Sequence, residues 1–492
     1  MRSRLKTFAS WSVLVLVIWG VVGAVWYWRS HEPSTGDLAL GLLGVPLMLI
    51  AGYVVLKHVL GHVLQAPALA QSGEASGAGS VTPREVEDRQ KHSTPMQLFV
   101  MGSSVKMPAG QTQELLQACM EEVRPDLDGE LCNDQGFPVM AARVAELDDI
   151  DALQWWDGLE LDAELPSGRA WVAQLTASKA REMRLLASVL AECAEAVERD
   201  ILLHARQNSS SKAKAVFPAL QVRLATAAGW DAGDLQHLQS WAQHWLKRSA
   251  PALRFDVRHY SPQSDVNFPW PSALLEAKDA VFQPSESDVF GGGEIWLLAA
   301  AHSEIDQSEV DRLAVSGQLY GPKYRNGRIV GEGAAAVTFL RHQVAKGVPA
   351  ASPKHRELAV VADAKLASIA ANSSQAIETM TVPMLEGCGV ISADIGRLFC
   401  DADHREAPLK GIALLLGQHF PDLSLESDCF PVGIANGNTG AVGALTSLIL
   451  AAEYAVQEQR AALALALASE PWRAAALLMP PGWGSDTGTE AA

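Results

Sequence analysis

The side chains best suited to chemistry lie closest together at residues 400–404, which read Cys-Asp-Ala-Asp-His. Thiolate, carboxylate and imidazole groups are the usual ligands of zinc and other divalent metal ions. A metal site has little support here, because Asp401 and Asp403 are two residues apart and no second pair of cysteines or histidines lies nearby. We therefore predict a solvated loop before a helix that begins near Ala407, and we expect no metal.

Two glycine-containing segments could form turns or bind ligands. Residues 291–293 are three glycines before an apolar run, but no Gly-Lys-Ser/Thr follows, so a turn is favoured over a phosphate-binding loop. Gly331-Glu332-Gly333 also indicates a turn, and we expect Glu332 to accept backbone N–H hydrogen bonds in the core. The sequence contains no Gly-x-Ser-x-Gly elbow, His-Glu-x-x-His motif or Walker motif.

Three segments of the C-terminal half share their order and rough spacing with one superfamily. Residues 324–340 read YRNGRIVGEGAAAVTFL, residues 390–420 hold a strand, an acidic segment and a helix, and residues 433–445 read GIANGNTGAVGAL. This arrangement resembles the β-ketoacyl synthases and the wider thiolase-like superfamily. The resemblance covers residues 267–480 and implies an α/β body built from a repeated βαβαβ unit, whose other half would be residues 96–266.

The resemblance does not extend to the catalytic groups of that superfamily. Its condensing enzymes use a cysteine nucleophile with two histidines, or with a histidine and an asparagine. The nucleophile would lie near residues 268–272, where Ser272 is the only hydroxyl residue and no cysteine is present. The positions of the two histidines and of a preceding lysine hold Ile395, Gly437 and Val432. We therefore predict a pseudoenzyme with no catalytic residue and no cofactor; an acyltransferase that uses Ser272 is the alternative.

Tryptophans concentrate in the half of the body where the resemblance is weakest. The chain has 14 of them, and Trp241 and Trp245 are four residues apart, so they share one helix face. Core packing is one interpretation. A partner-binding patch is the other, because tryptophan anchors often dominate interface energies. The residues proposed for this patch are Trp155, Trp156, Trp230, Trp241 and Trp245.

An alternating series of strands and helices must position these segments. Apolar runs predict strands at residues 96–105, 252–257, 294–301, 334–341, 358–362 and 389–393. The run at 294–301 lacks alternation with polar residues, which indicates burial on both faces. Apolar residues three and four apart predict helices at 111–123, 178–205, 235–248, 407–419 and 441–468. This alternation is typical of α/β domains.

The first 60 residues predict a transmembrane helical hairpin. Residues 11–28 and 38–56 are uncharged and apolar, and each is about long enough to cross a bilayer core. A signal peptide is disfavoured because bulky Trp26, Tyr27 and Trp28 stand where small residues precede a cleavage site. Two buried core helices are the other alternative. Three basic residues at the start and Lys57 after the second span favour cytoplasmic ends, and hence a body held at the inner membrane's cytoplasmic face.

Charge separates the hairpin from the rest of the chain. The chain has 39 basic and 56 acidic residues, a net charge of −17, which argues against a nucleic-acid-binding surface. Residues 1–60 carry five basic and two acidic residues, so the remainder is strongly acidic. Residues 61–95 have the composition of a flexible linker, and residues 481–492 that of a disordered tail. Six cysteines in 492 residues are too few for a disulfide scaffold.

One bacterial family combines a membrane hairpin, a tether and a degenerate thiolase-like body, namely the type VI secretion lipase adapter (accessory) proteins. This chain is similar to them in architecture and in the three segments above. The resemblance implies a non-catalytic adapter that binds a lipase effector in the cytoplasm and passes it to the VgrG spike protein. An inner-membrane scaffold unrelated to effectors is an alternative, and the body could also form a homodimer.

Overall fold

A computed structural model describes residues 98–148, 151–161, 164–207, 219–227, 229–259, 294–341, 358–368, 373–468 and 472–483. The predicted hairpin, the linker, residues 291–293, Ser272 and all but the first three residues of the predicted tail lie outside these ranges. Within them, no helix is long and apolar enough to cross a membrane.

The first repeat of the body contains five strands of a mixed sheet. They are β1 (Leu98–Lys106), β4 (Ala219–Ala225), β5 (Arg254–His259), β6 (Glu294–Ser303) and β7 (Val330–Arg341). Their order across the sheet is β5-β4-β6-β7-β1. The strand β4 runs parallel to β5 and β6, whereas β7 is antiparallel to both β6 and β1.

The second repeat has the same order of strands. It contains β8 (Val360–Ser368), β9 (Ile395–Cys400), β10 (Cys429–Pro431), β11 (Ala461–Ala466) and β12 (Trp472–Met479), arranged β10-β9-β11-β12-β8. In each repeat the fifth strand along the chain is antiparallel to its neighbours. The repeats meet where Leu98 and Phe99 of β1 pair with Val361 and Val360 of β8. The expected α/β body with a repeated five-stranded unit is therefore present, but the boundary between the two copies lies between β7 and β8 rather than near residue 267.

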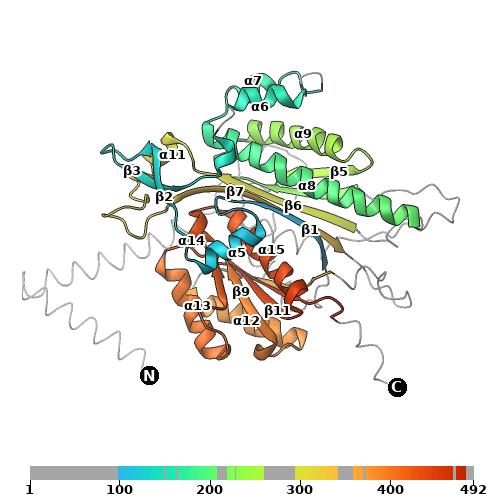
Figure 1. Ribbon diagram of the computed structural model, residues 1–492, viewed down its shortest axis with the longest axis vertical. Coiled ribbons are helices and arrows are strands. Elements are labelled where there is room, and N and C mark those ends of the chain that lie inside the picture. The colour runs from blue at the N-terminus through green and yellow to red at the C-terminus, as the bar shows by residue number, and fades with distance from the viewer. Residues whose placement is uncertain are drawn as a thin grey trace, which may run out of the picture. The chain divides into compact units, whose positions relative to one another are not determined.

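Helices separate and cover the two halves of this sheet in layers (Figure 1). Helix α8 (Ala177–Gln207) packs on β1, β6 and β7, and α9 (Ala232–Ser249) packs on β5. Helix α12 (Ser373–Cys388) covers β8 and β12, and α13 (Glu406–His419) packs beside it. Helix α15 (Ala441–Glu458) lies between the two halves and contacts strands of both.

Each central strand is buried on both faces because a separate core lies on each side of it. In β6, Ile295 and Leu297 join the core beneath α8 and α9, whereas Trp296 and Leu298 join the core around α15. In β11, alternate residues divide in the same way between the core around α15 and the core beneath α12 and α13. This confirms the prediction that residues 294–301 are buried on both faces.

Two predicted elements near the C-terminus were wrong in type or position. The helix expected over residues 441–468 ends at Glu458, where Gln459 has a left-handed φ of 53°, and residues 461–466 form β11. Alanine and leucine favour helix in isolation, but burial on both faces between two strands outweighs that preference. The strand expected at 389–393 begins instead at Ile395, after a short 3-10 turn at Ser392–Asp394.

A small arm projects from the first repeat and was not predicted. It contains β2 (Asp126–Cys132) and β3 (Pro138–Ala142), which form a hairpin after α5 (Thr112–Met120). The strand β3 also pairs in parallel with the start of β7. Helix α11 (Gln307–Val315) packs on β2. The remaining short helices are η2 (Ala145–Leu147), α6 (Ala152–Leu159), α7 (Gly168–Val172) and α14 (Gly433–Asn436).

Candidate functional site

Polar side chains converge at the end of β6, the start of β7 and the loop before α15, so both repeats contribute to this cluster. Glu304, just beyond β6, accepts a hydrogen bond from Asn438 Nδ2 at 2.7 Å. The same carboxylate oxygen lies 3.6 Å from His302 Nε2 and 3.6 Å from a guanidinium nitrogen of Arg328. A Cβ built on Gly440 would lie 3.0 Å from His302 Nδ1, so the backbone of this loop approaches the imidazole closely.

This His302–Glu304 pair has unusual electrostatics for a buried site. Burial alone would lower the pKa of His302, but Glu304 and the nearby Glu182 overcome it and raise that pKa above 6.5. Burial raises the pKa of Glu182 to about 7, against the opposing effect of His302. Among the described residues, His302 Nε2 and Glu304 Oε2 have no hydrogen-bond partner. An imidazole and a carboxylate in this state could exchange a proton with a bound group.

The Cys400–His404 segment is buried, so the predicted solvated loop was wrong. Cys400, Asp401 and Asp403 are almost fully buried at the end of β9. Asp401 accepts hydrogen bonds from the backbone N–H groups of Leu467 and Ala468, and so ties β9 to the end of β11. Within the part of the chain that the structure describes, no group of histidine, cysteine, aspartate or glutamate side chains could hold a metal ion. The carboxylates satisfy backbone groups instead.

Asp403 has a similar local role. Its carboxylate accepts hydrogen bonds from the backbone and side chain of Arg405, and the two side chains form an ion pair at 2.8 Å. Burial opposes the charge on Arg405, but Asp403 raises the pKa of this guanidinium. His404 contacts Tyr320 ring edge to ring face, with the ring centroids 4.9 Å apart.

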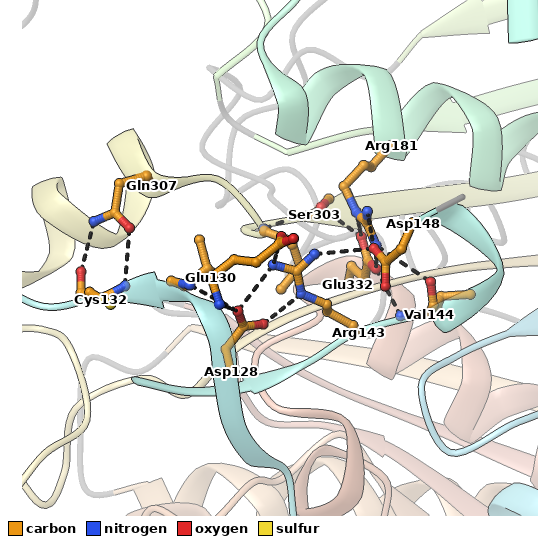
Figure 2. Close-up of polar contacts among 12 residues, drawn as sticks. Asp128, Glu130, Cys132, Arg143, Val144, Asp148, Arg181, Ser303, Gln307 and Glu332 are labelled. Atoms are coloured by element: carbon orange, nitrogen blue, oxygen red, sulfur yellow. Dashed lines mark hydrogen bonds and ion pairs between the residues drawn. The ribbon is translucent and has the colours of Figure 1, made fainter. Parts of the chain in front are cut away.

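Glu332 performs the backbone role that the sequence predicted, and it also carries a buried ion pair (Figure 2). The turn expected at Gly331-Glu332-Gly333 was wrong, because these residues lie within β7, where Glu332 and Gly333 pair with β6. The Glu332 side chain is fully buried and accepts a 2.8 Å hydrogen bond from the backbone N–H of Val144. Arg181 of α8 donates two hydrogen bonds to it, at 2.8 and 2.6 Å, and Ser303 donates a third at 2.9 Å. One carboxylate thereby joins β7, β6, α8 and the segment that follows the arm.

A series of ion pairs, with acidic and basic side chains in alternation, leads from Glu332 to the arm (Figure 2). Arg181 contacts Asp148 at 2.7 Å, and Asp148 contacts Arg143 at 3.1 Å. Arg143 donates to Asp128 at 2.5 Å. Although burial opposes it, Arg143 and two backbone N–H groups hold the pKa of Asp128 below its ordinary value. Beside this series of ion pairs, a shallow pocket of about 370 Å³ opens on the arm.

Three of the six cysteine thiols are poorly suited to nucleophilic catalysis. Burial raises the pKa of Cys119 to about 12 and raises that of Cys193 as well. The pKa of Cys400 is raised by its hydrogen bond with Cys429 and by burial. The thiolate is the nucleophilic form of cysteine, so these three thiols would be almost fully protonated at neutral pH.

The positions that the resemblance assigned to catalysis hold structural residues. Ile395 begins β9 and is buried, as is Val432. Gly437 lies in the loop that pairs with the start of β7, and its φ is +65°. Ser272 lies outside the described residues.

Three of the five tryptophans proposed for partner binding belong to the core. Trp156 and Trp241 are fully buried and Trp230 is nearly so, packed in the core beneath α8 and α9. A partner could not reach them without unpacking that core. Trp155 and Trp245 are half-buried at its margin, each beside Trp241. The docking surface predicted from these residues stays a prediction, and only this pair is accessible to a partner.

Sequence reasoning did not single out His302, Glu304, Arg181 or Arg143. One available signal was the Ala-His-Ser-Glu sequence at the end of a buried strand, because polar residues directly after such strands often face a site. The partners of these residues lie far away in sequence. Asn438, for example, follows Glu304 by 134 positions.

Comparisons with known proteins bear on the fold alone. No protein-family profile matches the chain, and no characterised protein matches it in sequence. Among solved structures, it is similar to the ishigamide ketosynthase/chain length factor, with 14% identity and a TM-score of 0.45, over 78% of this chain and 100% of that one. It is also similar to a ketosynthase in complex with its chain length factor from Xenorhabdus doucetiae, with 12% identity and a TM-score of 0.48, over 78% and 98% of the chains. A ketosynthase from module 6 of the bacillaene synthase of Bacillus subtilis 168 gives 10% identity and a TM-score of 0.49, over 78% and 72%.

Proposed function

We propose that the body is a non-catalytic, protein-binding member of the thiolase-like fold class. The observation that carries this proposal is the position and the protonation of the candidate nucleophiles. No cysteine occurs between Cys193 and Cys388, where a synthase nucleophile would lie, and the thiols of Cys119, Cys193 and Cys400 have raised pKa values. Buried Ile395 and Val432 stand where the resemblance would place polar groups.

The proposed partner is a type VI secretion lipase effector, which the protein would hold in the cytoplasm and help to load onto the VgrG spike. This part of the proposal rests on the resemblance in architecture and in the three C-terminal segments. The predicted hairpin of residues 1–60 would anchor the protein in the inner membrane. An inner-membrane scaffold without an effector partner is the alternative for the same architecture.

Three measurements test the proposal. Intact mass spectrometry after incubation with acyl-CoA should show no acyl adduct on the folded full-length chain. The tagged chain should co-purify with a lipase encoded beside it, and it should fractionate with the inner membrane. An acyl adduct would overturn the non-catalytic assignment, whereas a folded, membrane-bound chain that retains no lipase would overturn the adapter assignment.

One observation favours a second candidate, an acyltransferase of the same fold. The buried His302–Glu304 pair leaves an imidazole nitrogen and a carboxylate oxygen without hydrogen-bond partners in a cluster to which both repeats contribute. Such a pair could serve as a general base for a hydroxyl nucleophile. If this candidate is correct, the acyl adduct should form on Ser272, and His302→Gln should slow its formation while leaving the fold intact.

A further inference from the structure

Exposed apolar side chains gather on the arm in a way that suggests a partner. Eleven large apolar side chains are exposed among the described residues, and four of them lie between positions 120 and 137. Two belong to the β2–β3 hairpin itself, Leu127 at 67% exposure and Phe137 at 62%. Leu127 also lines the pocket of about 370 Å³. Exposed apolar groups beside a pocket commonly mark interaction sites.

The charge around these apolar side chains is strongly negative. Residues 121–148 contain eight acidic and two basic residues. Four carboxylates line the pocket, together with a single guanidinium, that of Arg143. The three salt bridges of Arg143 are to Asp128, Glu130 and Asp148. Its charge is thus shared among three acids, and the pocket keeps an excess of negative charge.

Three consecutive backbone N–H groups at the end of β2 already have acceptors, which disfavours recognition by an added strand at this point. Gln307 of α11 closes the strand at Cys132, where its amide donates to the carbonyl at 2.7 Å and accepts from the N–H at 3.1 Å (Figure 2). Asp128 accepts the N–H groups of Glu130 and Leu131. A partner must therefore be recognised through side chains.

We propose that the arm surface, made of Leu127, the acidic pocket that Leu127 lines and Phe137 of the same hairpin, docks a basic peptide segment of a partner protein that alternates cationic and apolar residues. The cationic side chains would enter the pocket beside Asp126 and Glu130, whose carboxylates lie at its exposed side. The apolar side chains would cover Leu127 and Phe137. Charge complementarity selects this occupant. The inference rests on the proposed binding role and names the chemistry of the segment that is bound.

The test measures binding of labelled peptides to the purified full-length chain by fluorescence anisotropy at physiological salt. The probes are an eight-residue peptide of alternating arginine and leucine, a second with serine in place of leucine, and a third with glutamate in place of arginine. The first should bind most tightly, the second about tenfold more weakly, and the third not measurably.

Matched variants locate the site. The double variant D126N/E130Q and the single variant Leu127→Ser should each weaken the first peptide about tenfold. The double variant D422N/E426Q removes two exposed charges from the other repeat, and Leu414→Ser removes an exposed apolar side chain from α13 of that repeat; both should bind as the wild type does. All six substituted positions are exposed, so folding should be unaffected, which circular dichroism would verify.

Three outcomes would overturn the inference. The first is that the control variants weaken binding as much as the arm variants do, which would indicate non-specific attraction to an acidic chain. The second is that the first peptide does not bind. The third is that the chain self-associates in a way that depends on Leu127, which would assign the surface to a second copy. If the peptide-binding test fails, the result of the acyl-adduct measurement is unchanged. Conversely, an acyl adduct together with arm-dependent peptide binding would overturn only the non-catalytic assignment.

Discussion

Replacing Glu332 should have the largest effect on stability of any single polar substitution in the network of Figure 2. The Glu332 carboxylate is fully buried and accepts four hydrogen bonds, from Arg181 (two), Val144 and Ser303. Glu332→Ala would leave the Arg181 guanidinium with Asp148 alone as a charged partner. It would also leave the Val144 N–H without an acceptor in a buried position.

The expected magnitude follows from this burial. Removing one partner of a buried ion pair typically costs about 3–5 kcal/mol, and we expect Glu332→Ala to fall in that range. Glu332→Gln keeps the volume and one acceptor, so it should cost about 1–3 kcal/mol. Asp148 is 40% exposed and shares its charge between two arginines. Asp148→Asn should therefore cost about 1 kcal/mol or less.

Urea unfolding followed by tryptophan fluorescence would measure these differences in the free energy of unfolding. Hydrogen exchange supplies a local readout, because the amide of Val144 should lose protection in Glu332→Ala and keep it in Asp148→Asn. If Glu332→Ala costs less than about 1 kcal/mol and Val144 stays protected, the carboxylate does not hold the arm to the core. The reasoning from burial would then be refuted.

Three further predictions concern a glycine, a buried acid and the thiols. A Cβ on Gly331 would lie 2.3 Å from the carbonyl oxygen of Asn436, so Gly331→Ala should strongly lower the urea concentration at the unfolding midpoint. The control is Gly387→Ala, in an open position of α12, which should leave this midpoint unchanged or raise it slightly. The pKa of Glu182 is raised from 4.5 to about 7, chiefly by burial, so the folded state holds a proton that the unfolded chain releases. Its contribution to stability is therefore present below pH 4.5 and is lost as the pH rises towards 7. Glu182→Gln should flatten this part of a stability–pH curve by up to ~1.4 kcal/mol per pH unit, and an unchanged slope would contradict the assignment. Iodoacetamide at neutral pH should spare the buried Cys193 and Cys400 in the native protein and label them in urea, as peptide mass spectrometry would show; rapid native labelling of either would contradict their burial.

The fold was predictable from sequence where burial leaves an unambiguous pattern. The run at 294–301 has no polar alternation, and it forms a strand with a core on each face. The motif around Glu332 predicted an acceptor for backbone N–H groups, and Val144 is one such donor. The distinction between helix and strand failed at residues 461–466, because a run of alanine and leucine fits either until its neighbours are known.

The candidate site was less predictable, because tertiary contacts create it. The charged residues Asp401 and Asp403 suggested solvent exposure, yet both are almost fully buried. Backbone N–H groups that follow β11 donate to Asp401, and the N–H of Arg405 donates to Asp403. Neither His302 nor Glu304 belongs to a motif of fixed spacing, and Asn438 reaches Glu304 only because the loop before α15 pairs with the start of β7. The tryptophans could be divided between core and margin only once α6 and α9 were positioned.

The position of β1 at the seam between the repeats has a consequence for how the protein is made. Residues 98–106 leave the ribosome first among the strands, but their partners are β7 and β8, which are synthesised more than 200 residues later. At roughly 5–20 residues per second, β1 waits on the order of 10 to 50 seconds with both edges unpaired. Unpaired strand edges are prone to aggregation. Ribosome-bound chains that end before residue 330 should therefore depend on chaperones, and that dependence should fall once residues 330–368 have emerged.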